Sequence, residues 1–208
     1  MKPVAWAVAI VASAALAIAS GDGWIAARWL FVFKPLTTVL IIAFAWSRGA
    51  DLLARQRWVR AGLLLSLAGD VALLWPVQGF LPGLVAFLLA HLAYIVAFTR
   101  GVRFAARPVA FAAYAVVAGG ILWWLWPGIP PALRVPVLAY VVCLATMAAQ
   151  ATAVGRLAAL GGALFVVSDA LLAANKFAAP LPLSALWILA SYWAAQSLIA
   201  NAGPSRSG

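Results

Sequence analysis

Long apolar segments follow one another along the whole chain, separated by short breaks that are basic or rich in proline and glycine. Each segment is close to the roughly 20 residues that an α-helix needs to cross a bilayer. The apolar runs are continuous rather than alternating, which favours helices over a membrane β-barrel. The pattern predicts an all-α fold with eight membrane spans, at residues 4–20, 29–47, 61–76, 80–99, 108–126, 132–152, 156–174 and 180–200.

The breaks between these segments have local causes. The segments SRGADLLARQRWVR (47–60) and RGVRFAAR (100–107) are predicted as basic loops. The segments PVQGFLPG (76–83), PGIPP (127–131) and APLP (179–182) contain the prolines and glycines that end helices. The first segment has an alternative interpretation as a cleaved signal peptide, because it starts with a basic residue and ends in small ones. Seven spans would then remain.

Composition supports the membrane interpretation. The 208 residues are 67% hydrophobic and 9% charged, whereas soluble domains are about half apolar and a quarter charged. We therefore expect one integral membrane domain over residues 1–208. The net charge of +10 does not indicate a nucleic-acid partner, because the basic residues lie between apolar runs, where membrane topology places them.

The distribution of Lys and Arg predicts an orientation. With the N-terminus inside, the outer segments hold only Arg28, Arg134 and Lys176. The inner segments hold ten basic residues, namely Lys2, Arg48, Arg55, Arg57, Arg60, Arg100, Arg103, Arg107, Arg156 and Arg206. Positive residues concentrate on the cytoplasmic side, so both termini are expected in the cytoplasm. The alanine-rich composition, with arginine preferred over lysine, suits a bacterial chain and hence the inner membrane.

The two halves of the chain contain a weak internal repeat. LAGDVALL (67–74) resembles VVSDALLA (166–173), and each is followed by a turn that contains proline. A duplication of four helices would give two halves of parallel orientation. Chance similarity between apolar helices is the alternative.

Three ionisable residues lie inside the predicted spans at one depth. Asp70 precedes Pro76, and Asp169 precedes Asn175, by six residues each, so both carboxyls lie roughly 9 Å below the outer boundary. Lys34 has a similar depth, and the three groups predict one shared polar pocket. Charged groups inside a membrane are costly and mark function by default. The structural alternatives are an Asp70–Lys34 pair, or a Lys34 side chain that extends to the interface.

Other polar residues join this set. His91, the single histidine, precedes Tyr94 by three residues, and Tyr192 precedes Gln196 by four, so each pair shares a helix face. Asn175 and Lys176 lie at the outer rim, as site residues or as interface anchors. One His and one Cys make a metal site unexpected.

Two buried carboxyls suit hydrolysis, because one can donate a proton while the other activates water. A proton-coupled transporter of a small amphiphile fits intramembrane Asp, Lys and His equally well. A structural protein whose acids only join helices is a third interpretation. These three classes remain open on the residues alone.

Several motifs resemble one family. KPLTT (34–38), GDVALL (69–74) with GFLPGLVAFLLAHLAYIVAF (79–98), and GALFVVSDALLAANKF (162–177) with SYWAAQSLIA (191–200) are similar to the YhhN family, also called the TMEM86 or lysoplasmalogenase family. The resemblance implies an eight-helix membrane hydrolase that cleaves the vinyl ether bond of lysoplasmalogens. The products would be a fatty aldehyde and glycerophosphoethanolamine or glycerophosphocholine. It implies a lysophospholipid substrate, no cofactor and no obligate protein partner.

The resemblance also implies the site positions, which are Lys34, Asp70, His91, Tyr94, Asp169, Asn175, Tyr192 and Gln196. Vinyl ethers hydrolyse by proton transfer to the β-carbon, followed by capture of an oxocarbenium ion by water. We therefore expect Asp70 and Asp169 to share the acid and base roles, in an order that the sequence does not give. Lys34 and Lys176 are expected to bind the phosphate, and the remaining polar side chains to orient water or the acids.

Overall fold

The computed structural model describes residues 3–47 and 54–202, and within these ranges the chain forms α-helices and turns but no strand. Each predicted segment contains one helix, which confirms the all-α fold class. The eight α-helices are α1 (Pro3–Gly21), α2 (Leu30–Ser47), α3 (Ala54–Ala72), α4 (Phe80–Thr99), α5 (Pro108–Leu125), α6 (Pro131–Val154), α7 (Arg156–Phe177) and α8 (Ser184–Asn201). Two short 3-10 helices, η1 (Ala27–Trp29) and η2 (Trp126–Gly128), lie in the turns before α2 and α6.

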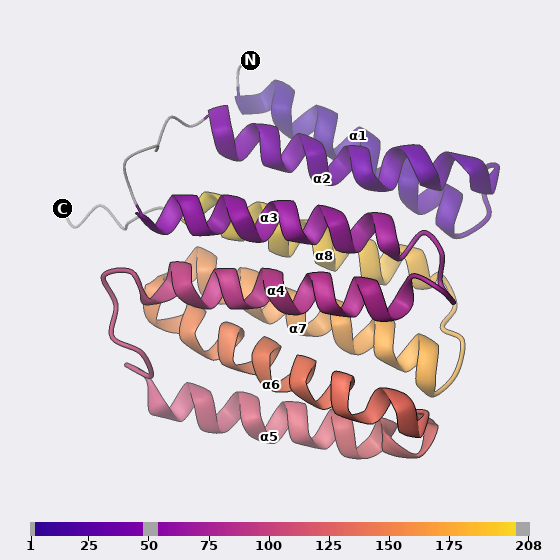
Figure 1. Cartoon of the computed structure of the whole chain (residues 1–208). Coiled ribbons are helices and arrows are strands. Elements are labelled where there is room, and N and C mark those ends of the chain that lie inside the picture. Colours follow the sequence, from indigo (N-terminus) through magenta and orange to yellow (C-terminus); the bar gives the residue numbers. More distant parts are fainter. Residues whose placement is uncertain (1–2, 48–53, 203–208) are drawn as a thin grey trace.

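Consecutive helices run in opposite directions, so α1 begins and α8 ends at the same end of the bundle (Figure 1). We call this the basic end, because the α4–α5 loop and the α6–α7 junction there carry Arg100, Arg103, Arg107 and Arg156. The other end, which we call the proline end, has turns with Pro76, Pro127 and Pro180. Arg28, Arg134 and Lys176 lie near the proline end, as predicted. Lys2, Arg48 and Arg206 of the predicted inner set lie outside the described residues.

Helix α8 is central, since it packs against α1, α2 and α3 as well as α7. Helix α5 lies at one edge, and its main neighbour is α6 (Figure 1). Helix α4 packs against α6 rather than along α5. Gln150 of α6 holds the intervening loop, because its amide donates to the carbonyls of Phe98 and Arg103 and accepts the Ala105 N–H, at 3.0–3.2 Å.

Six of the described helices are long and apolar enough to cross a membrane, and they are α1, α2, α4, α5, α6 and α7. Helix α3 differs from its predicted span of 61–76, because it begins at Ala54 and ends at Ala72. Residues 54–60, predicted as loop, form its first two turns, since Arg and Gln favour helices and no Pro or Gly interrupts them. Helix α8 begins at Ser184 instead of residue 180, because Pro180 and Pro182 disfavour a helical conformation in the residues before them.

Close packing of α3 against α4 depends on small residues. A Cβ on Gly62 would collide with the Tyr94 ring, and a Cβ on Gly69 would lie 2.5 Å from the Phe87 ring. A Cβ on Gly83 of α4 would lie 2.8 Å from Leu73. Small residues let membrane helices approach closely and improve van der Waals contact. These glycines therefore set the positions of two aromatic rings beside the polar core.

Asp22, in the turn after α1, caps the N-terminus of α8. Leu183, the residue before α8, has a φ of 52° and no side-chain oxygen that could cap the helix. The two carboxylate oxygens of Asp22 instead accept the N–H groups of Ala185 and Leu186, at 3.0 Å each. Such caps contribute about 0.5–2 kcal/mol. This one also fixes the start of α8 against α1.

The substitution Gly62→Ala should destabilise the protein by about 1–3 kcal/mol, because the added methyl group overpacks the Tyr94 ring. The matched control is Gly119→Ala in α5, where a Cβ would meet nothing within 4 Å. Thermal unfolding in detergent should show a lower Tm for Gly62→Ala alone. Equal Tm values for the two variants would contradict the proposed packing role.

Candidate active site

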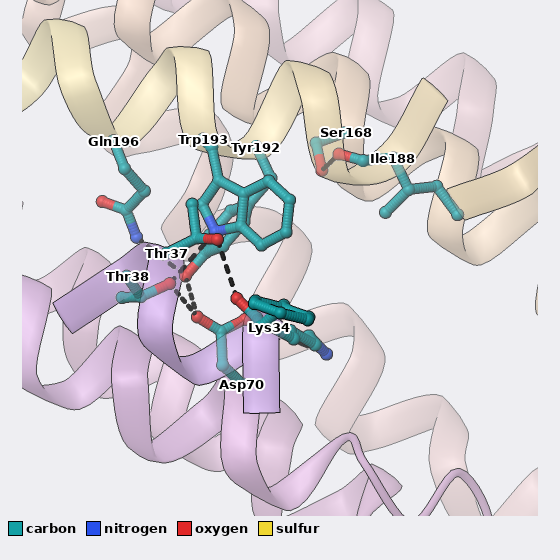
Figure 2. A network of polar contacts seen from close by, with 10 residues as sticks. Lys34, Thr37, Thr38, Asp70, Ser168, Ile188, Tyr192, Trp193 and Gln196 are labelled. Carbon is teal, nitrogen blue, oxygen red and sulfur yellow. Dashed lines mark hydrogen bonds and ion pairs between the residues drawn. The ribbon is translucent and has the colours of Figure 1, made fainter. Parts of the chain in front are cut away.

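Asp70 lies in the interior of the bundle with a full set of polar partners. Its Oδ2 accepts hydrogen bonds from the hydroxyls of Thr38 at 2.6 Å and Tyr192 at 2.7 Å. The ammonium of Lys34 lies 3.9 Å from Oδ1. Figure 2 shows these groups converging on Asp70 from α2 and α8. The Lys34 side chain is 10% exposed, so it pairs with Asp70 instead of extending to an interface.

Hydrogen bonds extend this cluster to a further helix. The Trp193 indole N–H donates to the Thr38 hydroxyl at 3.1 Å, and the Gln196 amide donates to the Tyr192 hydroxyl at 3.1 Å (Figure 2). The Tyr94 hydroxyl of α4 donates to Gln196 Oε1 at 2.6 Å. The network thus connects α2, α3, α4 and α8. Its hydrogen bonds fix both the position of Asp70 and the direction of its donors.

Asp169 on α7 has different surroundings. Its Oδ2 accepts a hydrogen bond from the hydroxyl of Tyr140 on α6. Its Oδ1 has no hydrogen-bond partner among the residues that the structure describes. Asp169 is also only half-buried, whereas Asp70 is 1% exposed. Asp70 thus has two hydrogen bonds and an ammonium beside it, whereas Asp169 has one hydrogen bond and no ion pair among the described residues.

His91 packs among aromatic rings and makes no hydrogen bond to either acid. Its ring packs against Phe165 at a centroid distance of 4.6 Å and against Tyr140 at 5.2 Å. It also contacts Tyr94 at 6.5 Å. Within the described ranges, neither of its ring nitrogens has a hydrogen-bond partner. His91 thus contacts the tyrosine of each acid's network and can position both.

A cavity of about 500 Å³ brings the predicted ionisable groups together. Lys34, Asp70 and Asp169 all line it, as expected from their common depth, and Tyr192 lines it as well. Apolar side chains from the α3–α4 turn and from α4, α7 and α8 also line it, and they include Leu73, Leu74, Phe80, Phe87, Leu172, Ile188 and Leu189. Gly21, Pro76, Lys176 and Ser184 line the part nearest the proline end.

Asn175 and Lys176 occupy the last turn of α7, at this mouth of the cavity. Asn175 Oδ1 accepts the N–H of Leu181 at 2.7 Å and so holds the α7–α8 turn. The Lys176 ammonium donates to the Pro76 carbonyl at 3.3 Å and lies 4.2 Å from the centre of the Phe80 ring. Lys176 is exposed, so its charge is accessible to a ligand that enters the cavity. Tyr94, His91 and Gln196 lie behind the wall instead of lining it.

Sequence reasoning missed two residues of the acids' hydrogen-bond networks. Tyr140 binds Asp169, but its helix carries no recognised motif, and the only signal was a lone tyrosine in the middle of an aliphatic segment. Trp193 orients Thr38, although tryptophan in a membrane protein is usually read as an interface anchor. The arrangement as a whole supplies two carboxyl groups, a cation and oriented hydroxyls at the wall of one cavity.

Comparison with known proteins agrees with the site motifs. Residues 29–202 match the YhhN family. The chain belongs to the YhhN family. A protein of Sus scrofa named lysoplasmalogenase TMEM86B is 35% identical over 165 residues, which are 79% of this chain and 70% of that protein.

Two further relatives have a similar level of identity. The lysoplasmalogenase TMEM86B of Homo sapiens is 34% identical over 85% of this chain and 74% of its own length. A lysoplasmalogenase of Mycobacterium bovis is 36% identical over 80% of this chain and 67% of its own length. No solved structure matches the chain significantly.

The substitution Tyr94→Phe should lower the free energy of unfolding by about 1–3 kcal/mol, because it leaves the buried Gln196 oxygen without its donor. The matched control is Tyr114→Phe in α5, since Tyr114 makes no hydrogen bond within the described part of the chain. Thermal unfolding in detergent measures both. A Tm for Tyr94→Phe no lower than that of Tyr114→Phe would show that the network contributes little to stability.

Proposed function

We propose that this YhhN-family chain is a lysoplasmalogenase, a membrane hydrolase that cleaves the vinyl ether bond of a lysophospholipid. The observation that carries the proposal is that Asp70 and Asp169 line one cavity, as a reaction with one proton donor and one proton acceptor requires. The names of relatives at 34–36% identity support the same activity. They favour a hydrolase over the transporter that intramembrane charges alone would allow.

The protein acts as an eight-span inner-membrane protein with both termini in the cytoplasm. Helices α3 and α8 are less apolar than the other six because α3 begins with Arg55, Arg57 and Arg60, and α8 carries Tyr192 and Gln196. Asp70 of α3 and Tyr192 and Gln196 of α8 are buried against neighbouring helices, so these polar side chains avoid lipid. The concentration of arginine at the basic end supports the cytoplasmic assignment of that end.

The reaction follows from vinyl ether chemistry. A carboxylic acid transfers its proton to the β-carbon of the C=C–O unit, and the electron pair of the double bond forms the new C–H bond. The resulting oxocarbenium ion is captured at its α-carbon by water, whose proton passes to the second carboxylate. The hemiacetal then loses the glycerol oxygen as an alcohol and leaves a fatty aldehyde. One proton is donated and one is taken up, so the pair of acids is restored after proton exchange.

The unequal surroundings of the two acids support a division of these roles. Asp70 faces the Lys34 ammonium and two hydroxyl donors, which suit a group that remains a carboxylate. Asp169 has Oδ1 unbonded toward the cavity, which suits a group that delivers a proton. Asp70 therefore stabilises the oxocarbenium ion and accepts the proton of water, and Asp169 is the acid.

The mouth of the cavity suits the phosphate of the substrate. Lys176 is exposed there, and Lys34 lies deeper beside Asp70, so cations stand at two depths of the same cavity. Lysine binds phosphate as a compact point charge. A lysophospholipid whose phosphate contacts these cations has its ether bond directed into the cavity, toward the acids.

Replacing either catalytic acid by its amide should remove the activity. Asp70→Asn and Asp169→Asn keep the shape of the side chain but cannot exchange a proton, so kcat should fall by about 10²–10⁴-fold in each. The measurement is aldehyde release from lysoplasmenylethanolamine by purified protein in detergent. Unfolding temperature and binding of the saturated alkyl-ether lysolipid, which has no double bond to protonate, show that each variant remains folded and binds. Either variant keeping most of its activity would contradict the two-acid mechanism.

A cationic analogue tests which acid stabilises the developing charge. A lysolipid with a secondary ammonium in place of the ether oxygen, and a saturated chain, carries a positive charge where the oxocarbenium ion develops one, and such analogues bind more tightly than substrate. We expect Asp70→Asn to weaken its binding by at least about tenfold, because the compensating carboxylate is lost, and Asp169→Asn to change it by less than about threefold. The reverse order would assign the carboxylate role to Asp169.

A further inference from the structure

A second, apolar groove lies on the other side of Asp169. It is enclosed by α4, α5, α6 and α7, and its wall includes Leu84, Ala118, Ile121, Val141, Leu144 and Ala145. Its volume is about 100 Å³, of the order of cavities that bind a small hydrocarbon. Apart from Asp169 and two tyrosines, its wall is made entirely of apolar residues.

The groove adjoins the polar cavity. Five residues line both spaces, and they are Leu73, Phe80, Phe87, Asp169 and Leu172. Asp169 is the charged residue among them, and its partner Tyr140 also lines the groove. Asp70 and Lys34 line the polar cavity only. Asp169 therefore stands at the junction of a polar space and an apolar one.

A ligand that fills both spaces must change from polar to apolar at the position of Asp169. In a lysoplasmalogen, the vinyl ether is the bond at which the glycerophosphate part meets the hydrocarbon chain. We propose that the groove between α4, α5, α6 and α7 binds the hydrocarbon chain of the substrate, which places the vinyl ether beside Asp169. This assignment rests on the proposed function for the identity of the substrate.

The position of α5 fits this role. Helix α5 lies at the edge of the bundle and packs mainly against α6, and almost all of it lies outside the buried interior. A chain longer than the groove can therefore continue past α5 into the surrounding lipid. A chain that comes from lipid gains little hydrophobic free energy in an apolar groove, so selection depends on the shape of the groove.

The proposal predicts that a larger side chain in the groove lowers activity more for substrates with long hydrocarbon chains than for those with short ones. Ala145 of α6 lines the groove five residues beyond Tyr140, about 7.5 Å further toward the basic end. Ala145→Phe should lower kcat/KM at least about tenfold for a hexadecenyl substrate, and less than about threefold for a hexenyl substrate that ends before the added ring. The matched control, Ala139→Phe, changes an exposed residue of the same helix and should leave both values unaltered.

Photocrosslinking provides a readout that does not depend on turnover. The probe is a saturated alkyl-ether lysolipid with a diazirine in the middle of its chain, and crosslinked peptides are identified by mass spectrometry. Labels on groove residues of α5 and α6, lost in Ala145→Phe, support the proposal even if the protein releases no aldehyde and the proposed activity fails. Aldehyde release with an unchanged chain-length profile in Ala145→Phe, or labels spread over the lipid-facing sides of other helices, would overturn the groove assignment and leave the activity standing.

Discussion

The free-energy cost of burying a carboxylate in an apolar bundle determines how the helices around Asp70 are arranged. A carboxylate inside a membrane bundle needs a cation and hydrogen-bond donors, because neither water nor lipid is available to replace them. Asp70 receives Lys34, Thr38 and Tyr192, and the network that orients these groups continues to Trp193, Gln196 and Tyr94. Four helices must keep their positions for this network to form. The polar side chains of α3 and α8 that join this network, Asp70, Tyr192 and Gln196, are consequently on the faces that these helices bury against their neighbours.

The need to satisfy buried charge also divides the molecule into a closely packed region around Asp70 and a region beside Asp169 that a ligand can enter. Around Asp70, glycines bring α3 and α4 into close contact, and aromatic rings fill the remaining space. The Tyr140 hydroxyl donates to one oxygen of Asp169, and this acid borders both the polar cavity and the apolar groove. Both hydrogen bonds that Asp70 accepts from the described residues end on Oδ2, so its Oδ1, 3.9 Å from the Lys34 ammonium, is free to accept the proton of water in the proposed reaction. The unbonded Oδ1 of Asp169 is free to deliver a proton to the substrate.

The sequence predicted the eight helical segments and the common depth of Lys34, Asp70 and Asp169, because bilayer thickness and helix rise relate position in a segment to depth. It did not predict which helices are neighbours. In a lipid-exposed bundle most faces are apolar, so hydrophobic periodicity does not identify the face that packs. For that reason the packing of α4 against α6, the Tyr140–Asp169 contact and the edge position of α5 emerged only in three dimensions. The prediction places the start of the third helix at residue 61, whereas α3 begins at Ala54. Charged residues between apolar segments indicate a loop, but arginine also favours helices.

The described aspartates show how surroundings assign different roles to one side chain. Asp22 accepts two backbone N–H groups at the α8 N-terminus, and this cap occupies both of its oxygens. Asp70 accepts hydrogen bonds from two hydroxyls and faces an ammonium, so its negative charge is balanced. It still lines the cavity. Asp169 has one hydroxyl partner and borders both the polar cavity and the apolar groove. The sequence contexts of Asp70 and Asp169 are similar, and each acid receives one tyrosine hydroxyl, from α8 and α6 respectively. The difference between them comes from α2, which supplies Thr38 and Lys34 to Asp70 alone. That inequality is what allows two identical side chains to act as acid and base on one bond.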